Sequence, residues 1–135
     1  PMDWDDHAMQ AGFSTASKTW LPIPVEHVLR SVNTQLGKLD SVLEHYRRFL
    51  AFRRQYPAFA KGDITFHEAG DAQLVYTRAF GNEKLLCVFN MNADSTSVPL
   101  PIGEWIGIDG HGFESAVNDN KVELPAWGAY FARHA

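Results

Sequence analysis

The sequence predicts a mainly β fold with one long α-helix, in which an antiparallel β-sandwich follows the helix. Apolar residues recur at three- and four-residue spacing over residues 40–56, which is typical of an amphipathic helix. From residue 62 onward the period becomes two, in short runs separated by Gly, Asn and Asp, which is typical of antiparallel strands. The chain has 135 residues, of which 45% are hydrophobic and 21% charged, so it is able to bury a core of its own.

Residues 1–39 are predicted to form a long loop, because prolines and glycines interrupt them and no apolar period runs through them. Residues 25–36 are predicted to hold one or two helical turns within it. A loop of this length in a compact domain is typical of a functional segment.

The helix is predicted over residues 40–56. Ser41 and Glu44 have the spacing of a capping box, with Asp40 as the alternative N-cap, and Pro57 ends the helix. Arginines crowd its second half, where they complement the helix dipole and are expected to form a solvated face. The residues that form its apolar stripe are Val42, Leu43, Tyr46, Phe49, Leu50 and Phe52.

Eight short strands are predicted after the helix. Gly81-Asn82 separates two alternating runs and predicts a tight hairpin. Many short strands at this spacing favour an antiparallel sandwich or barrel. The predicted strands are 64–68, 72–80, 84–91, 96–100, 105–108, 113–117, 121–124 and 129–133.

Composition excludes several classes of function. The net charge is −4 and no basic run exists, so we expect no nucleic-acid partner, and no apolar run approaches a membrane span. The single cysteine, Cys87, excludes an internal disulfide, and its apolar neighbours predict an inert core thiol. Six histidines lack zinc-motif spacing, so we expect no metal site and no cofactor.

An acidic cluster surrounds an indole in the N-terminal loop. Asp3, Asp5 and Asp6 flank Trp4. One interpretation is a substrate loop, in which carboxylates accept hydrogen bonds from sugar hydroxyls and the indole stacks on a pyranose ring. The other is loop capping by the Asp side chains, with Trp4 as an anchor. The pattern leaves both open and favours capping.

A second candidate surface lies among the aromatic residues of the predicted strands. Trp105, Trp127 and Tyr130 form a glucan-binding platform if all three face solvent. Their alternating, apolar surroundings favour core packing instead.

The chain resembles the C-terminal end of bacterial α-glucosidases of the α-amylase superfamily, over nearly its whole length. The segments that carry the resemblance are Pro1-Met2-Asp3-Trp4-Asp5, Ala11-Gly12-Phe13-Ser14, Trp20-Leu21-Pro22, the helix Ser41–Leu50 with Arg53-Arg54 and Pro57-Ala58, Gly62-Asp63-Ile64, Leu86–Asn90 and Pro125–Tyr130.

The resemblance implies a (β/α)₈ barrel enzyme with a C-terminal antiparallel β domain, whose active site lies at the carboxyl ends of the barrel strands. Residues 1–57 would be the tail of the barrel, namely its loop after strand eight and its last helix, and residues 58–135 the β-sandwich. The family's retaining glycoside hydrolases use an Asp nucleophile, a Glu acid/base and a second Asp on earlier strands. We therefore expect no catalytic residue in this chain and no activity from it alone.

The resemblance also implies that Asp3, Trp4, Asp5 and Phe13 lie in a substrate loop that shapes one wall of the sugar pocket. The expected partners are the rest of the catalytic barrel and, through the parent enzyme, an α-glucoside oligosaccharide. The exposed helix stripe, Trp4 and Phe13 predict a homodimer of the isolated chain. Family habit and the single cysteine favour a cytoplasmic location. Two alternatives stay open, a free-standing carbohydrate-binding module and the end of a related transglucosylase or isomerase.

Overall fold

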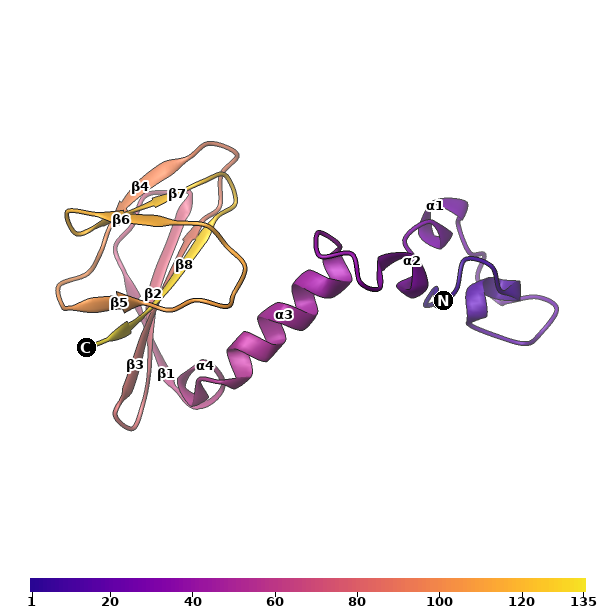
Figure 1. Ribbon diagram of the computed structural model, residues 1–135, viewed down its shortest axis with the longest axis horizontal. Helices are drawn as coiled ribbons and strands as arrows, with labels where there is room; N and C mark the ends of the chain where they lie inside the picture. The colour runs from indigo at the N-terminus through magenta and orange to yellow at the C-terminus, as the bar shows by residue number, and fades with distance from the viewer. The chain divides into compact units, whose positions relative to one another are not determined.

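The computed structural model describes residues 1–135, which form two compact units, Pro1–Arg48 and Phe49–Ala135. Figure 1 shows the order of the elements along the chain. The helices are a 3-10 turn at Met9–Gly12, α1 (Val25–Val28), α2 (Val32–Gln35), α3 (Val42–Arg54) and α4 (Pro57–Lys61). The strands are β1 (Asp63–His67), β2 (Gln73–Phe80), β3 (Glu83–Asn90), β4 (Thr96–Pro99), β5 (Trp105–Gly107), β6 (Ala116–Asn118), β7 (Lys121–Leu124) and β8 (Ala129–His134).

The first unit is mostly loop, as predicted, and backbone hydrogen bonds hold it together. The N–H of Val32 donates to the carbonyl of Asp3 and that of Asn33 to the carbonyl of Trp4, both at 3.0 Å. The start of α2 is therefore fastened to the N-terminal segment. The helical turns predicted within residues 25–36 are α1 and α2.

Helix α3 begins where the capping pattern placed it, but only half of the capping box forms. The N–H of Glu44 donates to Ser41 Oγ at 3.2 Å. The Glu44 carboxylate accepts instead from the N–H of Gly37, which a left-handed turn (φ 75°) brings within 3.1 Å. Pro57 ends the helix and becomes the first residue of α4, where its missing N–H costs nothing.

The second unit contains the predicted β-sandwich, and all eight predicted strands are present. A five-stranded sheet has the order β1-β2-β3-β8-β5, and a three-stranded sheet has the order β4-β7-β6. All pairings are antiparallel. The hairpin predicted at Gly81-Asn82 joins β2 to β3, with Phe80 opposite Glu83 and Gly81 at φ 59°.

The five-stranded sheet buries both of its faces over its centre. In β3, Leu86 and Val88 lie in the cluster between the two sheets, whereas Leu85 and Cys87 face the other way. Leu85 and Cys87 belong to a second hydrophobic cluster on that other face, which also contains Phe52 of α3 and Ala58 of α4. Burial raises the pKa of Cys87 to about 12, so it is an inert core thiol, as predicted.

The two compact units separate within α3 because its second half packs on the sheet. The ring centroids of Phe52 and Phe131 lie 5.3 Å apart, which assigns this end of the helix to the β unit. The sequence predicts a domain boundary between residues 57 and 58, where the catalytic barrel would end. The division into compact units describes packing within this chain and does not test that boundary, which stays a prediction.

Candidate functional site

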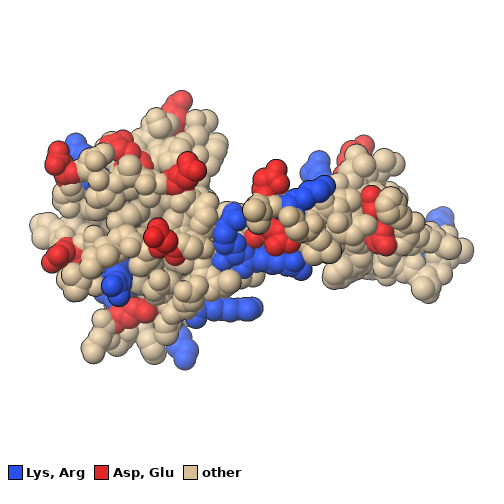
Figure 2. All heavy atoms as spheres, in the orientation of Figure 1, with Lys and Arg blue, Asp and Glu red and all other residues tan.

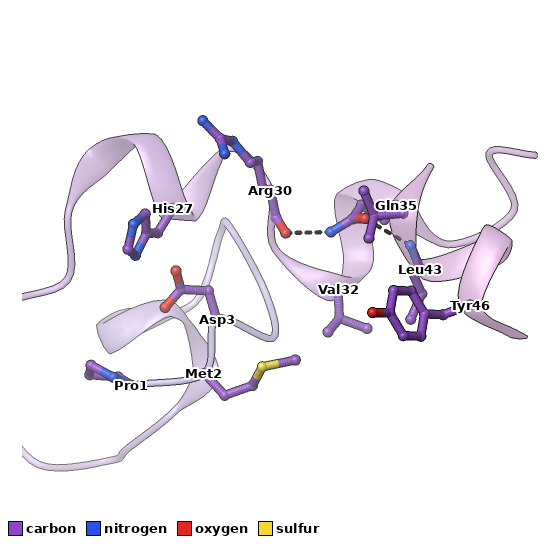
Figure 3. A pocket seen from close by; sticks show the side chains of 10 residues that line it. Pro1, Met2, Asp3, His27, Arg30, Val32, Gln35, Leu43 and Tyr46 are labelled. Atoms are coloured by element: carbon purple, nitrogen blue, oxygen red, sulfur yellow. Dashed lines mark hydrogen bonds between the residues drawn. The ribbon is translucent and has the colours of Figure 1, made fainter. Parts of the chain in front are cut away.

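A cavity of about 400 Å³ lies in the first unit, where three segments meet. Figure 3 shows the side chains that surround it. The Gln35 side chain spans one wall, since its Nε2 donates to the carbonyl of Arg30 at 2.6 Å and its Oε1 accepts from the N–H of Leu43 at 3.1 Å. The lining residues are Pro1, Met2, Asp3, His27, Arg30, Val32, Gln35, Val42, Leu43 and Tyr46.

Asp3 is the acidic side chain of this cavity. It is only 9% exposed, and its Oδ1 is buried with no hydrogen-bond partner. In Figure 3 its carboxyl group points toward His27. A buried carboxylate oxygen without a donor is costly, by roughly 1–3 kcal/mol or more. Asp3 Oδ1 is thus the acceptor of this cavity that no donor of the chain satisfies.

The carboxylates of Asp5 and Asp6, in contrast, already accept hydrogen bonds from residues of the first unit. The amide of Asn33 donates to Asp5 Oδ1 at 2.9 Å and to Asp6 Oδ1 at 2.6 Å. Its carbonyl oxygen accepts from the N–H of Asp6 at 3.2 Å and from Ser31 Oγ at 2.6 Å. The Asp5 carboxylate also accepts from the N–H of His7 at 2.9 Å, which is the predicted loop capping, whereas the Asp6 carboxylate is held by the side chain of Asn33. A sugar-facing role for Asp3 stays a prediction.

Trp4 and Phe13 are both about half exposed, as predicted, and a left-handed turn separates them along the chain. Gln10, Ala11 and Gly12 have φ of 53°, 49° and 70°. The positive φ of Gly12 favours glycine, and a Cβ there would also make a tight contact, 3.3 Å from the Cβ of Trp4. Left-handed non-glycine residues cost about 1–2 kcal/mol each and are typical of functional loops. Gly12 was the only sequence signal for this turn.

The apolar stripe of α3 is exposed at three of its six residues, whereas Leu43 is partly buried and Phe52 is fully buried. Val42, Tyr46 and Leu50 face solvent, as predicted. The prediction was wrong for Phe49, which is partly buried because its ring lies 5.8 Å from that of Phe131 and 6.3 Å from that of Phe113.

The three aromatic residues of the proposed glucan platform do not form one surface, so that interpretation is wrong. Tyr130 is buried between the sheets. Trp105 is partly buried, and its indole N–H donates to the carbonyl of Pro101 at 2.9 Å. Trp127 is exposed and precedes β8, whereas Trp105 lies opposite His134 at the far end of that strand. At the rise per residue of a β-strand, Trp127 and His134 are roughly 20 Å apart, so the two indoles do not share a surface.

Charged and metal-ligating residues do not gather into a further site. Figure 2 shows Lys and Arg around α3 and acidic residues scattered over the β unit. Two of the α3 arginines make local contacts: Arg47 pairs with Glu44 at 3.0 Å, and Arg53 donates to the carbonyl of Phe59 at 3.3 Å. No three His, Cys, Asp or Glu side chains are placed to hold a metal ion. None of the helices has the length and apolar character needed to cross a membrane.

Comparison with known proteins divides the chain in two. Residues 64–131 match the family model of the maltogenic amylase C-terminal domain. Residues 1–62 match the α-amylase catalytic domain. The β-sandwich and the segment before it thus correspond to consecutive domains of one type of enzyme.

Individual relatives agree with this division. The chain is 48% identical over all 135 residues to a protein of Rhizobium meliloti named "Probable alpha-glucosidase", of which it covers 24%. It is 30% identical over 106 residues to an oligo-1,6-glucosidase of Heyndrickxia coagulans, which is 78% of this chain and 19% of that enzyme. Among solved structures, the α-glucosyl transfer enzyme XgtA matches the whole chain with a TM-score of 0.90 and 34% identity, and the match covers 25% of XgtA.

The chain thus spans about a quarter of the length of these relatives, and the matched quarter includes the sandwich, the long helix and the loop before it. By its sequence and its fold, the chain belongs to the α-amylase superfamily, with the end of a catalytic domain followed by a maltogenic-amylase-type C-terminal β domain.

Proposed function

We propose that this chain is the C-terminal part of an α-glucosidase, a glycoside hydrolase that cleaves α-glucosidic bonds of small oligosaccharides. The observation that carries the proposal is the 48% identity to the Rhizobium meliloti protein along the entire chain. Within such an enzyme the chain is non-catalytic. Its first part completes the barrel, and its β-sandwich stabilises the end of the barrel through α3.

The loop of the first unit is the part of the chain that we assign to the sugar. The buried Asp3 carboxylate lacks a donor, and sugar hydroxyls are donors. Trp4 and Phe13 offer exposed aromatic surface nearby in the chain, which suits the apolar face of a pyranose. Asp5 supports this loop through Asn33 rather than acting as a free carboxylate. We therefore propose Asp3, Trp4 and Phe13 as wall-forming residues and Asp5 as a positioning residue.

The test is a replacement experiment. The quarter of the Rhizobium meliloti protein that this chain matches is exchanged for residues 1–135, and the chimera and the isolated chain are assayed on maltose and isomaltose. We expect the chimera to release glucose and the isolated chain to release none. A folded chimera without activity, or an active isolated chain, contradicts the proposal.

Glucosyl transfer is a second candidate, favoured by the match of the whole chain to XgtA at a TM-score of 0.90. Hydrolysis and transfer share the covalent glycosyl intermediate and differ in whether water or a sugar accepts the glucosyl group. Chromatography of the products formed from concentrated maltose separates the two: longer oligosaccharides indicate transfer, and glucose alone indicates hydrolysis.

We also propose a cytoplasmic location for the parent enzyme. The support is the cysteine content: the one cysteine is buried and reduced, which suits a compartment without disulfide formation. Cell fractionation followed by immunodetection tests it, and recovery of the enzyme outside the cytoplasm contradicts it.

A further inference from the structure

The loop that joins β5 to β6 in the second unit carries a sequence step that occurs once in the chain (Figure 1). Asp109 is followed by Gly110, and no other Asp or Asn of the 135 residues precedes a glycine. Glycine has no Cβ, so its backbone nitrogen is the least shielded that a preceding side chain can meet. A free Asp carboxyl group next to such a nitrogen is able to react with it.

The fold leaves both of these groups free. Asp109 is exposed, and its carboxyl group makes no hydrogen bond and no ion pair within the chain. The N–H of Gly110 likewise donates to no acceptor. The hydrogen bonds on either side involve other groups, since the N–H of Ile108 donates to the carbonyl of Phe131 and that of Phe113 to His111 Nδ1, both at 3.0 Å. Neither the carboxyl group nor the amide is therefore withdrawn into the fold.

The backbone at this step is loosely packed. Gly110 has a φ of 93° and Gly112 a φ of 83°, a conformation that glycine adopts at no steric cost. A Cβ on Gly110 would find its nearest neighbour, a ring carbon of Phe52, only at 4.0 Å. Asp109 also lines a cavity of about 300 Å³, which gives water access to its side chain and leaves room for a five-membered ring to form.

We propose that Asp109 is a modification site, at which the residue isomerises spontaneously to isoaspartate. The nitrogen of Gly110 attacks Cγ of Asp109, and the new C–N bond closes a succinimide ring. The hydroxyl group of the protonated carboxyl takes the amide proton and departs as water. Water then adds to the ring, and opening at the backbone carbonyl of Asp109 leaves the chain running through its side-chain carbon. The mass is unchanged, and water is the one co-reactant.

Isoaspartate at this position acts on a packed residue of the β unit. It adds one carbon to the backbone and turns the former backbone carbonyl into a free carboxylate. His111, two residues further on, is only 5% exposed, and its ring lies 5.3 Å from that of Phe52 and 5.0 Å from that of Phe131. A longer backbone beside His111 displaces this ring from the aromatic cluster that holds the end of α3. The modified chain is therefore less stable than the unmodified one.

Ageing of the chain tests the proposal. The protein is incubated at neutral pH and physiological temperature for several weeks, isoaspartate is quantified by enzymatic methylation of its free carboxylate, and peptide mapping by mass spectrometry assigns it to a position. Asp71 and Asp94 are internal controls, because both are exposed but precede Ala72 and Ser95. Asp109→Glu is the matched variant, since it keeps the charge but has to close a larger ring.

We expect isoaspartate at position 109 to reach a level at least about threefold above that at position 71 or 94, because only position 109 precedes a glycine. Asp109→Glu is expected to show none above background. Asp109→Asn forms the same succinimide with ammonia as the leaving group and is expected to convert faster. Equal levels at the three positions, or no isoaspartate at position 109, overturn the proposal.

Thermal unfolding tests the consequence for stability. The modified fraction, separated by hydrophobic-interaction chromatography, is expected to unfold at a Tm at least about 4 °C below that of the fresh chain, whereas Asp109→Glu aged in parallel keeps its Tm. A modified fraction that keeps the Tm of the fresh chain overturns the link through His111. Neither measurement depends on the proposed function, because both are made on the isolated chain.

Discussion

Truncation of Phe52 to alanine is expected to release the end of α3 from the β domain. Phe52 is 1% exposed, and its ring contacts those of Tyr56, Phe59, His111 and Phe131 at 5.3–5.5 Å. Removal of a fully buried Phe costs about 3–5 kcal/mol, from lost transfer free energy and the cavity left behind. For a unit of this size, 1 kcal/mol lowers Tm by roughly 4–8 °C, so we expect a fall of more than about 10 °C.

The assay is urea and thermal unfolding of the isolated chain, followed by far-UV circular dichroism. Leu50→Ala is the matched control, because Leu50 lies on the same helix but is exposed, and its loss is expected to cost less than about 1 kcal/mol. If Phe52→Ala costs no more than Leu50→Ala, the packing of α3 on the sheet does not hold the β domain together, and the reasoning is refuted.

Three further predictions concern acid stability, the loop and association. Burial lowers the pKa of His111, so as the pH falls below about 6.5 the unfolded chain takes up a proton before the folded chain does, and the stability declines. We expect Tm measured against pH to show this decline and His111→Phe to make the decline shallower. An unchanged slope in the variant contradicts the prediction. Asn33→Ala removes the side chain that joins Asp5 and Asp6 to α2, so proteolytic cleavage within residues 1–14 is expected to accelerate about tenfold, with unchanged cleavage as the contrary result. The exposed stripe of α3 predicts a concentration-dependent dimer of the isolated chain in light scattering, weakened by Tyr46→Lys; a monomer at all concentrations refutes it.

Local patterns predicted the elements well because each depends on residues close in sequence. Alternation over four to eight residues is enough to define a strand, and Gly81-Asn82 is enough to define the hairpin between β2 and β3. The three- and four-residue spacing of α3 and the stop at Pro57 likewise need no distant partner. The resemblance to α-glucosidases of the α-amylase superfamily also followed from ordered local motifs.

The candidate site depended on partners far apart in the sequence, which local patterns do not identify. Asp3 and Asp5 look equivalent in the sequence, yet Asp5 is bonded to Asn33, 28 residues away, while an oxygen of Asp3 is buried without a donor. Glu44 has the spacing of a capping box, but the left-handed turn at Gly37 supplies a competing donor.

By itself the sequence determined the family, the helix, the eight strands and the absence of an internal disulfide. Only the tertiary structure decided which strands share a sheet, that Tyr130 is buried while Trp127 is exposed, and that Phe131 is buried while Phe66 is exposed. The physical reason is that secondary structure follows from the period of neighbouring residues, whereas the burial of a side chain depends on which distant segment packs over it.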